Sequence, residues 1–141
     1  MGDRESIAPK FKLRHYLISF GFDNRLCRIV VISRLFENDP QGAAAKVRYQ
    51  ELLASLTEKY GKPRSIHSLG ESNYARPDWF TYGLHEGKSF WYSDFADPEV
   101  GVQLGIQGEL SGSARWRIFY ENKALMRSFR ESKRLKEKGS L

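Results

Sequence analysis

The sequence has a single cysteine, Cys27, so the chain can form no internal disulfide bond. Its three histidines lack the spacing of a zinc site, both among themselves and relative to the cysteine. No glycine-rich strand-to-helix segment of the kind that cradles a nucleotide is present. No serine, threonine or cysteine lies in a recognised nucleophile motif. The sequence therefore predicts no catalytic residue, metal site or cofactor.

Long apolar runs are also missing, since none approaches the ~18 residues that a membrane-spanning helix requires. No apolar segment follows a basic start at the N-terminus, as a signal peptide would require, so we expect a cytoplasmic protein. Removal of a native signal peptide would instead place it in the periplasm. The 141 residues, 40% of them apolar and 28% charged, suit one globular domain. We expect a flexible N-terminus at residues 1–10, a single domain at 11–122 and a partly docked basic helix at 123–141.

Two strands joined by a turn are predicted at residues 11–20 and 26–33. The first segment alternates apolar and polar side chains, and the second is rich in β-branched residues. Between them a glycine precedes Asp23 and Asn24, whose side chains readily bond the backbone of a turn. We expect a β-hairpin in which His15 and Cys27 have structural roles.

An amphipathic helix is predicted from Pro40 to Tyr60. Asp39 is a favourable N-cap, and proline suits the first helical position because its missing N–H has no partner there. Gly61 suits the left-handed residue that ends a helix, and Pro63 prevents continuation. This turn lies at the carbonyl end of the helix, where the dipole is negative, so we interpret it as a helix stop and not a phosphate site. The predicted core-facing stripe consists of Ala45, Tyr49, Leu52, Leu53, Leu56 and Tyr60.

The second half is predicted to form an antiparallel β-meander. Residues 78–95 hold seven aromatic side chains, and we expect two short strands there, on either side of Glu86 and Gly87. Residues 100–110 alternate most clearly, and a hairpin loop at 111–113 leads to a return strand at 114–120. The predicted packed face contains Val100, Val102, Leu104, Ile106, Leu110, Trp116, Ile118 and Tyr120. The predicted open face contains Gly101, Gln103, Gly105, Gln107, Glu109, Arg115, Arg117 and Phe119.

Basic side chains concentrate in a last predicted helix. Residues 123–138 carry seven Lys or Arg against two Asp or Glu, which is +5 of the chain's net charge of +6. Such a helix suits an acidic protein surface, nucleic acid phosphates or anionic lipid headgroups. The alternative is a solvated face whose charges stabilise the helix C-terminus. The basic stripe on one side of this helix consists of Lys123, Arg127, Arg130, Arg134 and Lys138.

The helix stop and its surroundings carry a resemblance. The pattern Tyr49-x-x-Leu52-x-x-x-Leu56-x-x-Lys59-Tyr60-Gly61-Lys62-Pro63, followed by an alternating strand and "IFYENKAL" before a charged helix, resembles small uncharacterised bacterial proteins. The resemblance spans residues 11–141 and implies a capped helix between a hairpin and a meander. It also implies export, although this chain lacks an export signal, and it implies no catalytic residues.

Taken together, these patterns predict an α+β protein whose antiparallel sheet, built from the hairpin and the meander, is packed by one central helix. We expect a non-enzymatic binding module that engages an acidic or protein partner through the open sheet face or the basic C-terminal helix. A nucleic-acid-associated accessory protein is the alternative, a small-molecule enzyme is a third, and the sequence predicts no oligomeric state. The partner-binding residues predicted are Lys123, Arg127, Arg130, Arg134, Lys138, Gln103, Gln107, Arg115 and Arg117.

Overall fold

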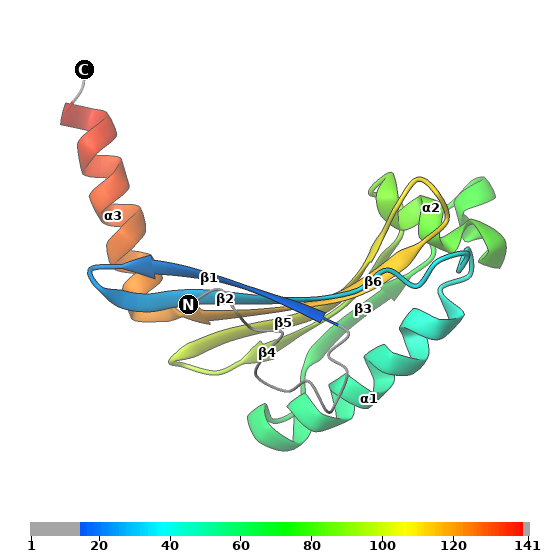
Figure 1. The fold of residues 1–141 in the computed structure, drawn as a ribbon, viewed down its shortest axis with the longest axis horizontal. Helices are drawn as coiled ribbons and strands as arrows, with labels where there is room; N and C mark the ends of the chain where they lie inside the picture. The colour runs from blue at the N-terminus through cyan, green and yellow to red at the C-terminus, as the bar shows by residue number, and fades with distance from the viewer. Residues whose placement is uncertain (1–14, 140–141) are drawn as a thin grey trace.

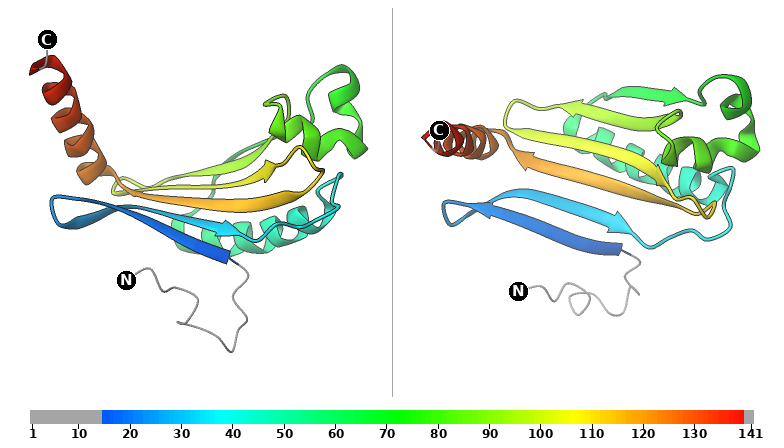
Figure 2. Two further views of the ribbon diagram at one scale, coloured as in Figure 1. Left: turned by 45° about the horizontal axis from the view of Figure 1, so that its top comes forward. Right: turned by 90° about the horizontal axis from the view of Figure 1, so that it is seen from above.

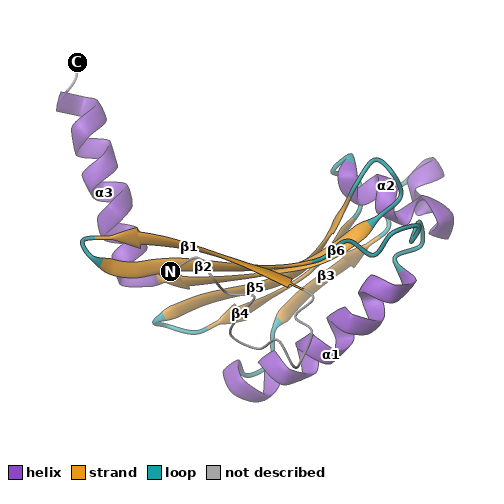
Figure 3. Cartoon of the chain, in the orientation of Figure 1, coloured by secondary structure: helices purple, strands orange, loops and turns teal. Residues whose placement is uncertain are grey.

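The chain builds a six-stranded antiparallel sheet with helices at one face and at both ends. The computed structural model describes residues 15–139, whose helices and strands are coloured in Figure 3, and the expected flexible segment at 1–10 lies outside them. The strands are β1 (His15–Phe22), β2 (Arg25–Ser33), β3 (Arg64–Ser68), β4 (Phe90–Ala96), β5 (Val100–Gly108) and β6 (Ala114–Asn122). The helices are α1 (Ala43–Tyr60), α2 (Phe80–His85) and α3 (Lys123–Gly139), with short 3₁₀ turns at η2 (Ser72–Ala75) and η3 (Pro77–Trp79). The α+β prediction is confirmed.

The strand order β1-β2-β6-β5-β4-β3 joins the two halves of the chain in one sheet. The N-terminal hairpin attaches through β2 to β6, the last strand, with Arg28 opposite Glu121 and Ile32 opposite Arg117. Strands β5 and β4 continue outward from β6 as part of the predicted meander, and β3 forms the far edge. The hairpin and the meander therefore share one sheet, as expected.

One face of this sheet is covered and the other is open. Helix α1 lies against one face, and none of the described helices lies across the opposite face (Figure 1). Seen from above in Figure 2, the strands lie in front of α1, with α3 at one end of the sheet and α2 at the other. The sheet bends so that its open side is concave. The side chains of this concave face in the central strands include Arg28, Val30, Ile32, Tyr92, Asp94, Gln103, Gln107, Arg115, Arg117, Phe119 and Glu121.

The core lies between α1 and the convex side of the sheet. Leu104 and Tyr49 are fully buried there, and Leu56 of α1 and Trp116 of β6 are buried beside them with a small exposed fraction. Alternate residues of β5 and β6 supply this layer, as the period of two predicted. Leu110 is an exception, with 66% of its surface exposed, because β5 ends at Gly108 and the chain then turns.

Helix α1 starts later than predicted. Its first residue is Ala43 and not Pro40, because Gly42 adopts a left-handed φ of 68° immediately before it. A side chain at Gly42 would lie 2.6 Å from the Phe80 ring, so α2 approaches the backbone closely here. The N-cap residue is therefore Gly42 and not Asp39 as predicted, although the Asp39 carboxylate still accepts the N–H groups of Ala44 and Ala45 at 3.3 and 3.2 Å. At the other end the helix stops at Tyr60 as predicted, and Gly61 donates its N–H to the Thr57 carbonyl at 2.8 Å.

The strand predicted before Glu86 was wrong, because that segment is helical. Residues 77–85 form a 3₁₀ turn followed by α2, and Phe80 of this helix is fully buried. The helix packs so closely on the end of β5 that a side chain at Gly108 would meet the Thr81 carbonyl oxygen. This tertiary contact decides the local structure, since the aromatic alternation alone favours a strand. The edge strand β3 was not predicted at all.

Helix α3 is docked by its first turns only. Leu125 and Met126 are buried against Cys27, which confirms a packing role for the cysteine. The Phe129 ring packs edge-on against Phe22, with ring centroids 5.6 Å apart. Beyond these contacts the helix projects away from the sheet (Figure 1). No described helix is both long enough and apolar enough to cross a membrane.

We expect Leu56→Ala to lower the free energy of unfolding by about 2–5 kcal/mol, because it removes a buried side chain between α1 and the sheet and leaves a cavity. Chemical denaturation would measure this loss. Val47→Ala on the same helix is the matched control, since 65% of the Val47 surface is exposed. Equal stabilities of the two variants would contradict the packing of α1.

Candidate functional site

The concave face brings together the four sheet residues that the sequence singled out. Gln107 lies opposite Arg115 and Arg117 lies opposite Gly105, so these side chains are neighbours across β5 and β6. Gln103 lies one pair further along, opposite Phe119. The alternation of β5 and β6 therefore placed all four on the same, uncovered side of the sheet.

A hollow of about 410 Å³ lies in this face toward the α3 end. Its floor includes Gly101, where the absence of a side chain leaves space between the neighbouring strands. The polar side chains that line it are Arg28, Asp94, Gln103 and Glu121. The hollow therefore offers both donors and acceptors near the α3 end of a surface that no described helix covers.

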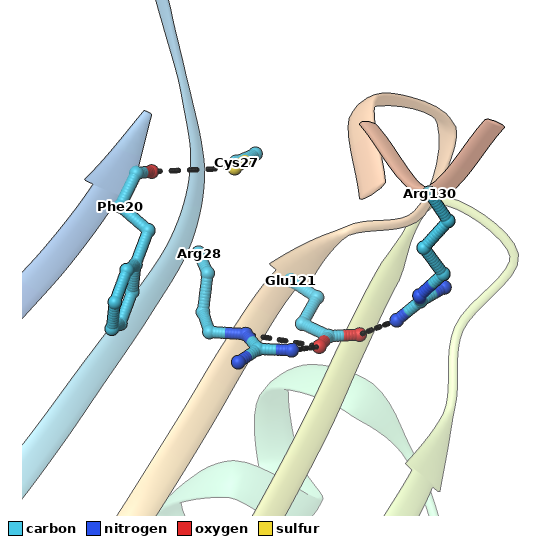
Figure 4. Close-up of polar contacts among 5 residues, drawn as sticks. All are labelled: Phe20, Cys27, Arg28, Glu121 and Arg130. Atoms are coloured by element: carbon cyan, nitrogen blue, oxygen red, sulfur yellow. Dashed lines mark hydrogen bonds and ion pairs between the residues drawn. The ribbon is translucent and has the colours of Figure 1, made fainter. Parts of the chain in front are cut away.

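Glu121 connects the concave face with the basic stripe of α3. The Nη2 and Nε atoms of Arg28 donate to Oε1 of Glu121 at 2.5 and 3.1 Å, and Nη2 of Arg130 lies 3.7 Å from Oε2 (Figure 4). One carboxylate thus holds a guanidinium from β2 and another from α3. A second hollow, of about 540 Å³, is lined by Glu121, Lys123, Arg127, Arg130, Glu131 and Arg134. Because Glu121 borders both hollows, the sheet face and the stripe form one surface.

The members of the basic stripe differ in how strongly they are held. Lys123 donates to the Asp97 carbonyl at 2.5 Å, and Arg130 contacts Glu121. Arg134 pairs with Glu131 of the same helix at 2.6 Å, with both side chains exposed. Arg127 and Lys138 are exposed. Both Arg127 and Arg134 are therefore accessible to an anionic partner. The ion pair of Arg134 does not prevent this, because an exposed ion pair contributes little to stability.

Most charges of the concave face are paired within the domain. Arg28 pairs with Glu121, and Arg64 lies 3.3 Å from Asp94. Asp94 also accepts a hydrogen bond of 2.8 Å from Gln103. At the other end of the face, Nε of Arg115 lies 3.7 Å from the Glu109 carboxylate. The sequence pattern placed Glu109 on the open face, whereas it did not predict Glu121 and Asp94, because their arginine partners come from strands distant in the chain.

A second polar cluster lies on the convex side of the sheet, between α1 and the strands β3 and β4. The Tyr49 hydroxyl, in the core, forms hydrogen bonds with Ser93 at 2.5 Å and with Nε2 of His67 at 3.0 Å. The His67 ring stacks on Trp91, at 4.3 Å between centroids, and Lys46 lies 4.3 Å from the same indole ring. Burial raises the pKa of Tyr49, so its hydroxyl stays neutral. The cluster satisfies a buried tyrosine and ties α1 to β3 and β4, which is a structural role.

Within residues 15–139, no group of three or more His, Cys, Asp or Glu side chains is arranged to hold a metal ion. Comparisons with protein-family models, with curated proteins and with solved structures found no significant match to the chain. The functional assignment therefore depends on the geometry of the concave face.

The polar cluster predicts a pH dependence of stability. Burial and the charge of Lys46 lower the pKa of His67 from its ordinary value of about 6.5. The unfolded chain then binds this proton more readily, so the stability contributed by neutral His67 is complete above about pH 6.5 and is lost as the pH falls through the folded pKa. We expect unfolding free energy to decrease more between about pH 7 and pH 5 in the wild type than in His67→Gln.

Denaturation at each pH would measure the difference, and the His67 ring signals in NMR would give its pKa directly. Lys46→Met removes the nearby charge and should raise that pKa. An unchanged pKa in Lys46→Met, or equal pH profiles of wild type and His67→Gln, would contradict this reading of the cluster.

Proposed function

We propose that the protein is a non-enzymatic binding module that holds an extended, acidic segment of a protein partner on the concave face and the basic stripe. The observation that carries the proposal is the continuity of the two surfaces through Glu121. The sequence left the sheet face and the helix as separate candidates. Their shared border supports a single binding surface with a polar floor and a basic wall.

Charge complementarity favours an acidic partner. Arg127 and Arg134 lie exposed on the wall, and Arg117 on the floor has no ion-pair partner among the described residues. Folding gains little from cations gathered on one side of a helix, since neighbouring like charges repel by a few tenths of a kcal/mol. An anionic partner would offset this repulsion and strengthen association at low salt.

A peptide suits the floor better than a nucleic acid does. Glu121, Asp94 and Glu109 lie among the arginines of the floor, and these carboxylates would repel a continuous phosphate backbone. A protein segment, in contrast, can place its acidic side chains at intervals. The amide groups of Gln103 and Gln107 can also donate to and accept from the peptide backbone.

We expect a fluorescent peptide of alternating Glu and Ser (the Glu–Ser peptide) to bind the protein, with an affinity that decreases as the salt concentration is raised. An uncharged control peptide of the same length, in which Gln replaces every Glu, should bind weakly. The double variant Arg127→Glu/Arg134→Glu should lose affinity and keep a nearly unchanged melting temperature, because both side chains are exposed. Fluorescence anisotropy and thermal unfolding would measure the two effects.

The matched control is Arg48→Glu/Arg76→Glu, which changes the net charge equally, with Arg48 on α1 and Arg76 in the turn before η3. If both double variants lose the same affinity for the Glu–Ser peptide, net charge alone explains the effect and the proposal is wrong. The proposal is also wrong if the wild type does not bind this peptide. Tighter binding of a single-stranded oligonucleotide of equal length would instead support the nucleic-acid alternative.

A further inference from the structure

Arg117 differs from the other arginines of the concave face. Arg28, Arg64 and Arg115 each have a carboxylate within ion-pair distance. Arg117 has none among the described residues. Its buried Nε atom has no hydrogen-bond partner there, which is also true of Arg115 Nε. The side chain is half-buried near the middle of the sheet, with its guanidinium carbon 5.1 Å from the centroid of the Phe119 ring.

This arrangement is unfavourable for the isolated protein. Desolvation by burial, followed by the neighbouring charge of Arg115, lowers the pKa of Arg117 from its ordinary value. Glu109 offsets part of this effect, although it lies within ion-pair distance of Arg115. A buried donor without a partner also costs free energy, because it has lost its hydrogen bonds to water.

Arg117 has a neighbour without a side chain on one side only. Ile32 lies directly opposite it on β2, and Gly105 lies directly opposite on β5, where a Cβ atom would be 3.3 Å from the Cβ of Tyr92. Gln103 and Gln107 are the diagonal neighbours of Arg117 on β5. The contact with Phe119 holds the planar guanidinium at the sheet surface, which reduces the rotamer entropy lost when it binds a planar anion.

We propose that Arg117 is the specific anchor of the concave face and binds one carboxylate side chain of the acidic segment, an inference that rests on the proposed function. A carboxylate matches the planar fork of a guanidinium and can accept two hydrogen bonds from it. Its single negative charge also balances the arginine of the face that has no ion pair among the described residues. The paired arginines then shape the surface, whereas Arg117 confers specificity for the acidic residue.

The anchor predicts opposite effects on affinity and on stability. Arg117→Met removes the charge but keeps an apolar stem against Phe119. We expect it to weaken binding of the Glu–Ser peptide about tenfold, as the loss of a charge-assisted contact would. It should leave the melting temperature unchanged or raise it, since the free protein loses a half-buried unpaired charge. Arg117→Lys keeps the charge without the fork and should bind between the wild type and Arg117→Met.

Two controls separate this inference from the proposed function. Arg48→Met makes the same change of charge on α1, away from the concave face, and should keep wild-type affinity. Arg28→Met breaks the pair with Glu121 and should lower the melting temperature. If Arg117→Met binds the Glu–Ser peptide with the same affinity as Arg48→Met, Arg117 is not the anchor. The same conclusion follows if the melting temperature of Arg117→Met is as low as that of Arg28→Met. Neither result contradicts the proposed binding function. If the wild type fails to bind the peptide, both proposals fall.

Discussion

The pairing of β2 with β6 is the constraint on which the rest of the structure depends. It joins the beginning of the chain to its last strand, so that residues more than eighty positions apart lie side by side, such as Arg28 and Glu121. The same pairing brings Cys27 to the start of α3, where Leu125 and Met126 cover it. Without this long-range contact there would be neither a docked helix nor a surface shared between helix and sheet, because both require the hairpin at the β6 edge.

The two faces of the sheet have different physical requirements. The convex side is apolar and is covered by α1, whose contacts with β4, β5 and β6 bury the large side chains of the core. The concave side satisfies most of its charges with ion pairs. An antiparallel sheet tolerates such an arrangement, since one of its faces can remain in water. The exception is Arg117, whose half-buried charge does not help the domain itself.

Local patterns predicted a large part of this architecture. The stripe from Ala45 to Tyr60 identified α1 and its buried side, and the alternation of β5 and β6 placed Gln103, Gln107, Arg115 and Arg117 on the open face. The prediction of a strand before Glu86 was wrong because tertiary contacts override the local strand propensity of that segment. Phe80 and Thr81 belong to a helix because the end of β5 and the start of α1 enclose them, and no local signal reports that enclosure.

The sequence by itself determined the class of the fold, the helix stop at Gly61 and the concentration of positive charge in α3, because periodicity, capping and net charge are local properties. Only the tertiary structure decided which charges are paired. Whether an arginine finds a carboxylate depends on strand order and register, which set Glu121 between Arg28 and Arg130 and left Arg117 opposite a glycine. Strand neighbours are chosen by the packing of the whole domain, so this distinction among chemically identical side chains cannot be read from residue spacing.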